Sequence, residues 1–156
     1  MILPHNSLVL VTDGRKMLLL RNDGIDGKIQ LRTESHDFRD DDKNRDIRSD
    51  APGLSGQSAG FGRPAFDEPD YHQLDENIWA AKTAEILNVR ALENDFEKLV
   101  VIAPPRTMGE LRQHWHKATL SRIVAEITKE MTDRPIKEIE SLLAGEGAPP
   151  SGGGSN

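Results

Sequence analysis

The chain has 156 residues, no cysteine and a formal net charge of −6, with 36% hydrophobic and 29% charged residues. This length predicts one domain with enough apolar material for a hydrophobic core, and the lack of cysteine excludes disulfides and thiolate chemistry. No run approaches the ~18 apolar residues of a membrane-spanning helix, and the first residues lack the positive segment of a signal peptide. We therefore expect a cytoplasmic protein without membrane insertion.

The first third of the chain predicts three strands. Residues 8–11 and 17–20 are apolar runs, and Asp13-Gly14 between them is a strong turn signal, so these two runs should form a hairpin. Over 29–33, apolar and polar residues alternate, which is typical of a strand with one face in water.

The next segment changes character. It begins with a run of mixed charges and continues as a stretch rich in glycine and small residues, with nothing that could form a core. Because such long connections are uncommon inside compact domains, the pattern predicts a long mobile loop over 39–69. The glycine-rich end predicts a flexible tail over 145–156, which leaves a single domain over 1–144.

Helix and strand then alternate. Residues 70–92 predict a helix from propensity more than from a regular apolar stripe. Residues 99–102 form a continuous apolar run, typical of a strand that is covered on both faces, and Ala103-Pro104-Pro105 ends it. Thr107 stands three residues before Glu110, and this capping-box spacing predicts a helix over 108–117.

The last elements are a strand and a helix. Residues 120–131 fit both a strand and a helix, and we favour a strand over 122–130. Pro135 suits the first turn of a final helix that has an apolar face over 136–143. The resulting order, βββαβαβα, predicts an α/β ribonuclease H-like three-layer fold, with a mixed five-stranded sheet and helices on both faces.

This order suggests a metal-dependent nuclease as a first hypothesis. Such an enzyme needs converging carboxylates, which Asp13 on the first strand and Glu76 on the first helix could supply. The fourth strand, however, ends in Ala103-Pro104 with no acid, and Asp13 has a sufficient role in its turn. The residues therefore argue against a nuclease, and we predict neither a metal site nor a cofactor.

Other constellations are equally weak. His114 and His116 are two residues apart, so on a helix they would point to different faces and would not form a metal pair. Ser55 and Ser58 have no Gly-x-Ser-x-Gly context. Arg106 follows two prolines before a helix, where it could help backbone amides to bind an anion or could simply be an exposed first-turn residue.

Four blocks of the sequence resemble a known family. They are PHNSLVLVTDGRKMLLLRNDG (4–24), GQSAGFGRPAFDEPDYH (56–72), FEKLVVIAPPRTMGELRQHWHK (96–117) and IVAEITKEMTDRPIKEIESLL (123–143), with LVVIAPPRTMGELR the most specific part. They are similar to the bacterial host-attachment family, often labelled "protein required for attachment to host cells". That family is related in fold to the middle domain of archaeal and eukaryotic class-1 peptide-chain release factors, which is ribonuclease H-like.

The resemblance implies a function for the long loop. In those release factors a Gly-Gly-Gln loop joins the third strand to the first helix and enters the peptidyl-transferase centre. Here Gly56-Gln57 occupies the same connection, with Ser55 in place of the first glycine. The resemblance thus implies Gly56 and Gln57 as catalytic residues for hydrolysis of the peptidyl-tRNA ester. It also implies a set of RNA- or partner-binding residues: Ser55, Ser58, Arg63 and Arg106.

Two functional hypotheses follow from the sequence. The first is a cytoplasmic stand-alone release-factor-like domain that acts on the ribosome or on tRNA, either by hydrolysis or by occupancy. The second is a non-enzymatic protein-interaction module with an unknown protein partner, which affects host attachment indirectly. The acidic balance of the chain argues against an RNA partner, because RNA usually meets basic surfaces, whereas the position of Gly56-Gln57 argues for one. We favour the release-factor-like domain and keep the interaction module as the alternative.

Overall fold

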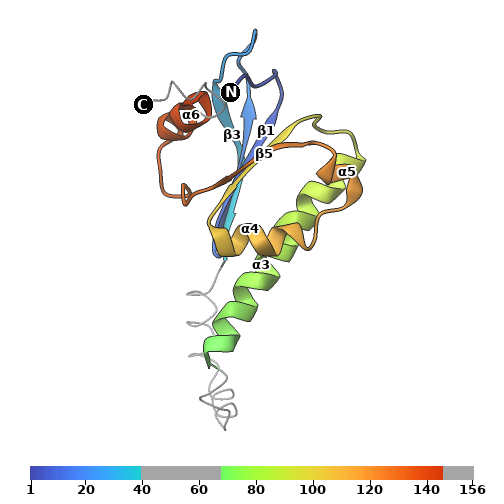
Figure 1. The fold of residues 1–156 in the computed structure, drawn as a ribbon, viewed down its shortest axis with the longest axis vertical. Helices are drawn as coiled ribbons and strands as arrows, with labels where there is room; N and C mark the ends of the chain where they lie inside the picture. Colours follow the sequence, from blue (N-terminus) through green and yellow to red (C-terminus); the bar gives the residue numbers. More distant parts are fainter. Residues whose placement is uncertain (40–67, 146–156) are drawn as a thin grey trace.

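The computed structural model describes residues 1–39 and 68–145, with side chains in the second range from Leu74 onward. Within these ranges Figure 1 shows a sheet with helices on both sides. The strands are β1 (Leu8–Thr12), β2 (Lys16–Asn22), β3 (Leu31–Phe38), β4 (Leu99–Ala103) and β5 (Ile123–Thr128). The helices are α3 (Glu68–Leu92), α4 (Pro105–Arg112), α5 (Lys117–Leu120) and α6 (Ile136–Gly145).

The five described strands form one mixed sheet in the order β3-β2-β1-β4-β5. β2 is antiparallel to both β1 and β3, whereas β1, β4 and β5 run parallel to one another. Val11 at the centre pairs with Leu18 on one side and with Ile102 on the other. The predicted mixed five-stranded sheet of a ribonuclease H-like α/β fold is confirmed.

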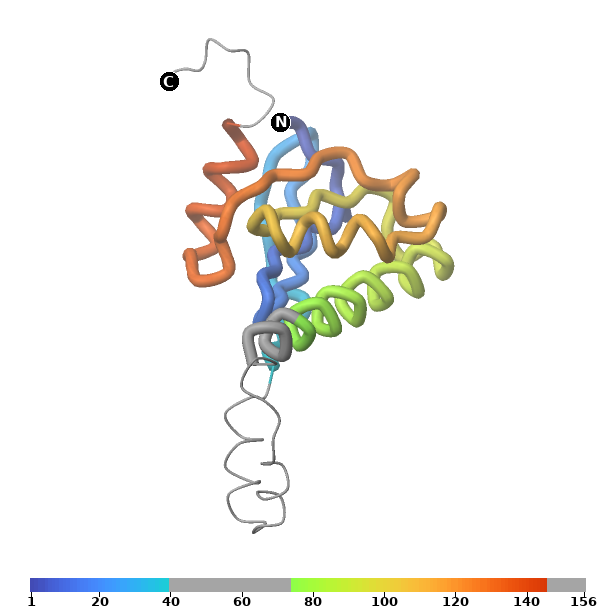
Figure 2. The backbone as a smooth tube through the Cα atoms, turned by 60° about the horizontal axis from the view of Figure 1, so that its bottom comes forward, coloured from blue at the N-terminus to red at the C-terminus, as the bar shows by residue number. Residues whose placement is uncertain are grey.

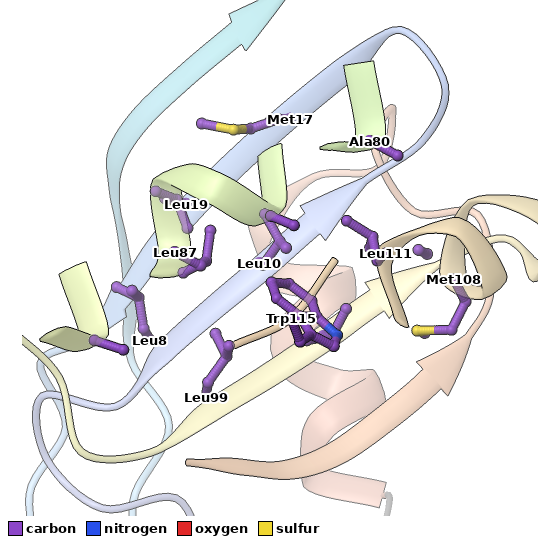
Figure 3. Close-up of a cluster of buried hydrophobic side chains, with 14 of the residues drawn as sticks. Leu8, Leu10, Met17, Leu19, Ala80, Leu87, Leu99, Met108, Leu111 and Trp115 are labelled. Atoms are coloured by element: carbon purple, nitrogen blue, oxygen red, sulfur yellow. The ribbon is translucent and has the colours of Figure 1, made fainter. Parts of the chain in front are cut away.

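The central strands β1 and β4 are buried along their whole length, so their alternate residues form two separate cores. On one face, Leu8, Leu10 and Leu99 pack with Leu87 of α3 and Trp115, as Figure 3 shows. On the other face, the intervening side chains pack against α6: Val9, Val11, Val100, Ile102, Ile139 and Leu143. The continuous apolar runs in the sequence are therefore the signature of strands covered on both faces.

Helix α6 lies on one side of the sheet, and α3, α4 and α5 lie on the other (Figures 1 and 2). The predicted fifth strand at 122–130 is confirmed as β5. The final helix is confirmed too, although it extends to Gly145, the first residue of the predicted tail. The predicted loop over 39–69 falls mostly on residues 40–67, and the remainder of the predicted tail is 146–156. Both stretches lie outside the described residues.

The predicted start of the helix after β4 is wrong. α4 begins at Pro105, not at Met108, and Pro104 occupies the N-cap position without a side-chain cap hydrogen bond. Proline is favourable in the first turn because its fixed φ suits a helix and its missing N–H would have no partner there. Thr107 is only 8% exposed and lies inside the helix, so it does not form the expected capping box.

The predicted helix over 108–117 is also interrupted. α4 ends at Arg112, and the chain turns before α5. Trp115 lies in this turn and is 7% exposed, because it belongs to the core between the sheet and α3 (Figure 3). The turn is held by Asn88 of α3, whose side chain donates to His114 O (2.9 Å) and accepts from His116 N (2.9 Å). Burial of an indole and bonds to another helix therefore override the local helix pattern.

Strand β3 is longer than predicted. The alternation indicated 29–33, whereas the strand spans Leu31–Phe38 and pairs with β2 as far as Lys16↔Phe38. Only Leu31 in β3 is buried. An edge strand is held mainly by backbone hydrogen bonds to its neighbour, and these leave no apolar pattern in the sequence.

Candidate functional site

Several described strands end at one edge of the sheet, which we call the carboxyl edge. β1, β4 and β5 are parallel, and β3 has the same direction because two antiparallel pairings separate it from β1. Their carboxyl ends therefore meet at this edge, where binding sites of open α/β sheets are usually found. Here the carboxyl edge consists of the β1–β2 turn, the end of β3, the start of α4 and the segment after β5.

The connection from β3 to α3 leaves the sheet at the carboxyl edge. β3 ends at Phe38 and α3 begins at Glu68, so Gly56-Gln57 belongs to the connection between them. The predicted catalytic and binding residues of this connection all lie outside the described residues: Ser55, Gly56, Gln57, Ser58 and Arg63. What the structure describes is the part of the molecule from which this connection leaves and to which it returns.

The first described residue after β3 and the first described side chains of α3 contact the β1–β2 turn or each other. The Arg39 backbone N–H donates to Arg15 O at 2.7 Å. The Arg39 guanidinium, 12% exposed, lies 3.9 Å from the Asp75 carboxylate on α3. Glu76 lies over the turn, because a Cβ atom at Gly14 would stand 2.8 Å from the Glu76 Cδ. The end of β3 and the first turns of α3 are thus packed together.

Asp13 organises the turn itself. Its Oδ1 accepts hydrogen bonds from the backbone N–H groups of Arg15 (2.8 Å) and Lys16 (2.7 Å), and its Oδ2 accepts one from the Thr132 hydroxyl (2.7 Å). Lys16 forms an ion pair with Asp133 on the same segment after β5, and the hydrogen bond and charge of Asp133 raise the pKa of Lys16. The Asp13 carboxylate therefore joins two sides of the carboxyl edge.

These contacts also locate the residues of the nuclease hypothesis. Glu76 lies beside Gly14, the residue that follows Asp13 in the chain. The fourth strand ends in Ala103, so it supplies no acid at its end. In residues 1–39 and 68–145, no three His, Asp or Glu side chains are grouped so that they could hold a metal ion. Asp13 uses both carboxylate oxygens for hydrogen bonds within the protein.

Arg106 is the predicted site residue that the structure describes. Val11 pairs with Ile102, so the ends of β1 and β4 lie at the same level and α4 starts at the carboxyl edge beside the β1–β2 turn. Arg106 is exposed in the first turn of α4, where backbone N–H groups and a positive helix end favour an anion. The structure thus brings Arg106 to the same edge as the base of the β3–α3 connection.

The two histidines lie away from this edge, beyond the far end of α4. His114 Nε2 is 3.1 Å from Glu110, and His116 Nε2 is 3.9 Å from Glu85. Each histidine therefore lies beside a different carboxylate.

Sequence reasoning missed the residues that anchor the connection: Arg39, Asp75 and Thr132. No local pattern distinguishes them, because each contacts a residue that is distant in the chain. Charged side chains at the carboxyl edge also largely balance one another, since Arg39 faces Asp75 and Lys16 faces Asp133. The described part of the carboxyl edge can therefore bind through backbone amides and individual side chains rather than through a strongly basic surface.

Comparison with known proteins gives one family. No helix in the described part of the chain is long and apolar enough to span a membrane, and no curated protein sequence matches the chain. The family model of bacterial archaeo-eukaryotic release factor family 12 matches residues 6–143, which include every described strand and nearly all of α6. The chain therefore belongs to bacterial archaeo-eukaryotic release factor family 12.

Proposed function

We propose that this release-factor-like protein acts in the cytoplasm on ribosomes that hold peptidyl-tRNA, and that Gly56-Gln57 supplies the groups that promote attack by water. The observation that carries the proposal is the position of this dipeptide, in the connection between β3 and α3 of a chain from a release factor family. The placement of that connection at the carboxyl edge of an open α/β sheet supports it further.

The proposed reaction is hydrolysis of the ester between the peptide and the tRNA. A water molecule attacks the ester carbonyl carbon, the carbonyl oxygen becomes an oxyanion, and the tRNA hydroxyl leaves with a proton. The backbone N–H of Gln57 would stabilise that oxyanion, while its side chain admits water and excludes larger nucleophiles. Gly56 would allow backbone angles that a residue with a Cβ atom rarely adopts.

The anchored base of the connection supports this role. A loop that carries the reactive geometry of release needs a rigid base, and the contacts of Arg39, Asp75 and the β1–β2 turn join the end of β3 and the described part of α3 to the sheet. Arg106, exposed at the same edge, is suited to contact an RNA phosphate. Within the connection, Ser55, Ser58 and Arg63 would supply further polar contacts to RNA.

The first test measures peptide release from peptidyl-tRNA bound to ribosomes. Wild type should release peptide, and Gly56→Ala should reduce the rate by about a hundredfold, because it displaces the oxyanion donor. Gln57→Ala should also abolish most release, and Gln113→Ala, an exposed glutamine between α4 and α5, should leave the rate unchanged. Ser55→Gly, which restores the release-factor tripeptide, should accelerate release.

The same experiment also distinguishes the translational role from the second hypothesis, a non-enzymatic interaction module with an indirect effect on host attachment. The net charge of −6 favours this alternative. Absence of both peptide release and co-sedimentation with ribosomes would overturn the translational role and leave the interaction module. Release that is unchanged in Gly56→Ala and Gln57→Ala would assign the reaction to a different part of the chain.

A further inference from the structure

Helix α3 carries a second apolar face that points away from the sheet. Five large apolar side chains on it are 39–66% exposed: Leu74, Ile78, Ile86, Val89 and Leu92. The opposite face of the same helix supplies core residues such as Ala84 and Leu87, and α3 runs along the outside of the molecule in Figure 2 (green). Single exposed apolar residues are ordinary, but five on one helix face form a patch that marks a contact surface.

The spacing of this face is that of a helix pair. Four of the five apolar residues form a line with two charged ones, and Ile86 lies beside that line: Leu74, Ile78, Lys82, Glu85, Val89 and Leu92, at intervals of four, four, three, four and three residues. Steps of three and four keep side chains on one seam, which is the pattern by which one helix packs along another. The seam has apolar residues towards both ends, with one lysine and one glutamate near its middle.

This seam is complementary to itself when a second copy is turned end for end. Around a midpoint between residues 83 and 84, the antiparallel alignment places Ile78 opposite Val89 and Lys82 opposite Glu85. Leu74 and Leu92 come within one residue of each other at the two ends of the seam. Two-fold symmetry produces each of these pairs twice. A seam built for an unrelated partner has no reason to be matched in this way along its own length.

We propose that α3 is the dimerisation helix of this protein and packs antiparallel against α3 of a second copy. The apolar pairs supply the favourable burial. The Lys82–Glu85 pairs set the register, because sliding the antiparallel pair by seven residues would place Lys82 opposite Ile78 or Leu92. The seam from Leu74 to Leu92 is roughly 27 Å long at 1.5 Å per residue. One helix pair of this length is a small interface, so we expect a weak dimer that dissociates on dilution.

Charge reversal tests the register. The full-length protein should show a concentration-dependent monomer–dimer equilibrium in sedimentation velocity experiments. Lys82→Glu or Glu85→Lys should weaken the dimer at least tenfold, because two like charges then face each other twice, whereas the double variant Lys82→Glu/Glu85→Lys should regain it. Far-UV circular dichroism and urea midpoints identify any variant whose monomer is itself destabilised, which matters for Glu85 because it lies near Asn88 and His116.

Apolar and cysteine variants complete the test. Val89→Asp should abolish the dimer, and Ile25→Asp, at a 60% exposed position in the β2–β3 loop, should not affect it. Because the chain has no cysteine, Ile78→Cys and Val89→Cys can report the alignment by disulfide formation. When the two variants are mixed, the cysteine at position 78 of one copy should form a disulfide rapidly with the cysteine at position 89 of the other. Ile78→Cys alone should not, since its two sulfurs would be roughly 16 Å apart along the helix pair.

Three results would overturn the proposal. One is a protein that remains monomeric up to its highest soluble concentration. Another is a dimer that survives both Val89→Asp and the single charge reversals, because its contact would then lie elsewhere. The third is cross-linking of Ile78→Cys with itself in preference to Val89→Cys, which would indicate a parallel pair. None of these results depends on whether the protein acts on ribosomes.

Discussion

Asn88 is a fully buried amide on α3 that determines the path of the chain between α4 and α5. Its Nδ2 donates to His114 O at 2.9 Å, and its Oδ1 accepts from His116 N at 2.9 Å and from the Thr119 hydroxyl at 2.6 Å. Asn22 has a similar role in the β2–β3 loop, where it contacts five backbone groups. Such residues look like ordinary polar positions in the sequence, but their burial makes each bond expensive to lose.

We expect Asn88→Ala to lower the free energy of unfolding by about 2–4 kcal/mol, because it leaves several buried polar groups without partners. Urea denaturation monitored by tryptophan fluorescence measures the effect, since Trp115 lies in the segment that Asn88 holds. The exposed Gln113→Ala is the matched control and should change stability by less than about 0.5 kcal/mol. Equal stability of the two variants would contradict this role of Asn88.

A pair of glycines offers a second prediction at the scale of single residues. A Cβ atom at Gly24 would lie 2.2 Å from Lys28 O, a backbone atom that cannot move aside, whereas a Cβ atom at Gly109 in α4 would meet nothing within 4 Å. Gly24→Ala should therefore reduce the free energy of unfolding by about 1–3 kcal/mol. Gly109→Ala should increase it by about 0.5–1 kcal/mol through helix propensity. Thermal melting of both variants checks the opposite signs.

At the scale of elements, an ion-pair network joins β2, β3 and α3 at the edge of the sheet opposite the carboxyl edge. Arg21 contacts Glu34 and Asp95, both at 3.0 Å, and Arg90 contacts the same two carboxylates at 2.6 and 2.7 Å. Burial alone would raise the pKa of Glu34, but hydrogen bonds from Arg90 and Arg21 outweigh burial and lower it. The pKa of Asp95 is lowered in the same way.

This network predicts a loss of stability in acid. A carboxyl group whose pKa is lower in the folded than in the unfolded protein stabilises the fold above its unfolded pKa, which is about 4. That stabilisation is lost as the pH falls through the lower, folded pKa. Glu34→Gln should therefore cost about 1–3 kcal/mol at pH 7 and flatten the fall in unfolding free energy below about pH 5.

Urea titrations at a series of pH values test this prediction. Glu97→Gln, at an exposed position before β4, is the matched control and should leave the pH dependence of wild type intact. A Glu34→Gln protein with the same acid sensitivity as wild type would show that the network does not couple folding to pH.

At the scale of the whole molecule, α3 has a different role on each of its two faces. Asp75 faces Arg39 at the carboxyl edge, and Arg90 near the end of the helix faces Glu34 near the opposite edge. Its inner face completes a core, and its outer face forms the proposed dimer seam. An antiparallel pair of α3 helices would point the two carboxyl edges in opposite directions.

Local chemistry was sufficient to predict the main elements of this protein. Continuous β-branched runs identified β1 and β4, and Pro104-Pro105 identified the end of β4, because burial on both faces and the missing proline N–H act within a few residues. The order of the elements then indicated the ribonuclease H-like fold. The connection that contains Gly56-Gln57 could also be placed between the third strand and the helix that follows.

Only the tertiary structure decided the features that depend on distant partners. It ended α4 at Arg112, because Asn88 and the buried Trp115 require a turn there, and it extended β3 through backbone pairing with β2. It explained the ragged apolar pattern of α3 as two apolar faces, of which the sheet covers one. It also brought Arg39, Asp75, Asp13 and Thr132 to one edge, because strand order and register, which no short stretch of sequence contains, determine which distant side chains meet.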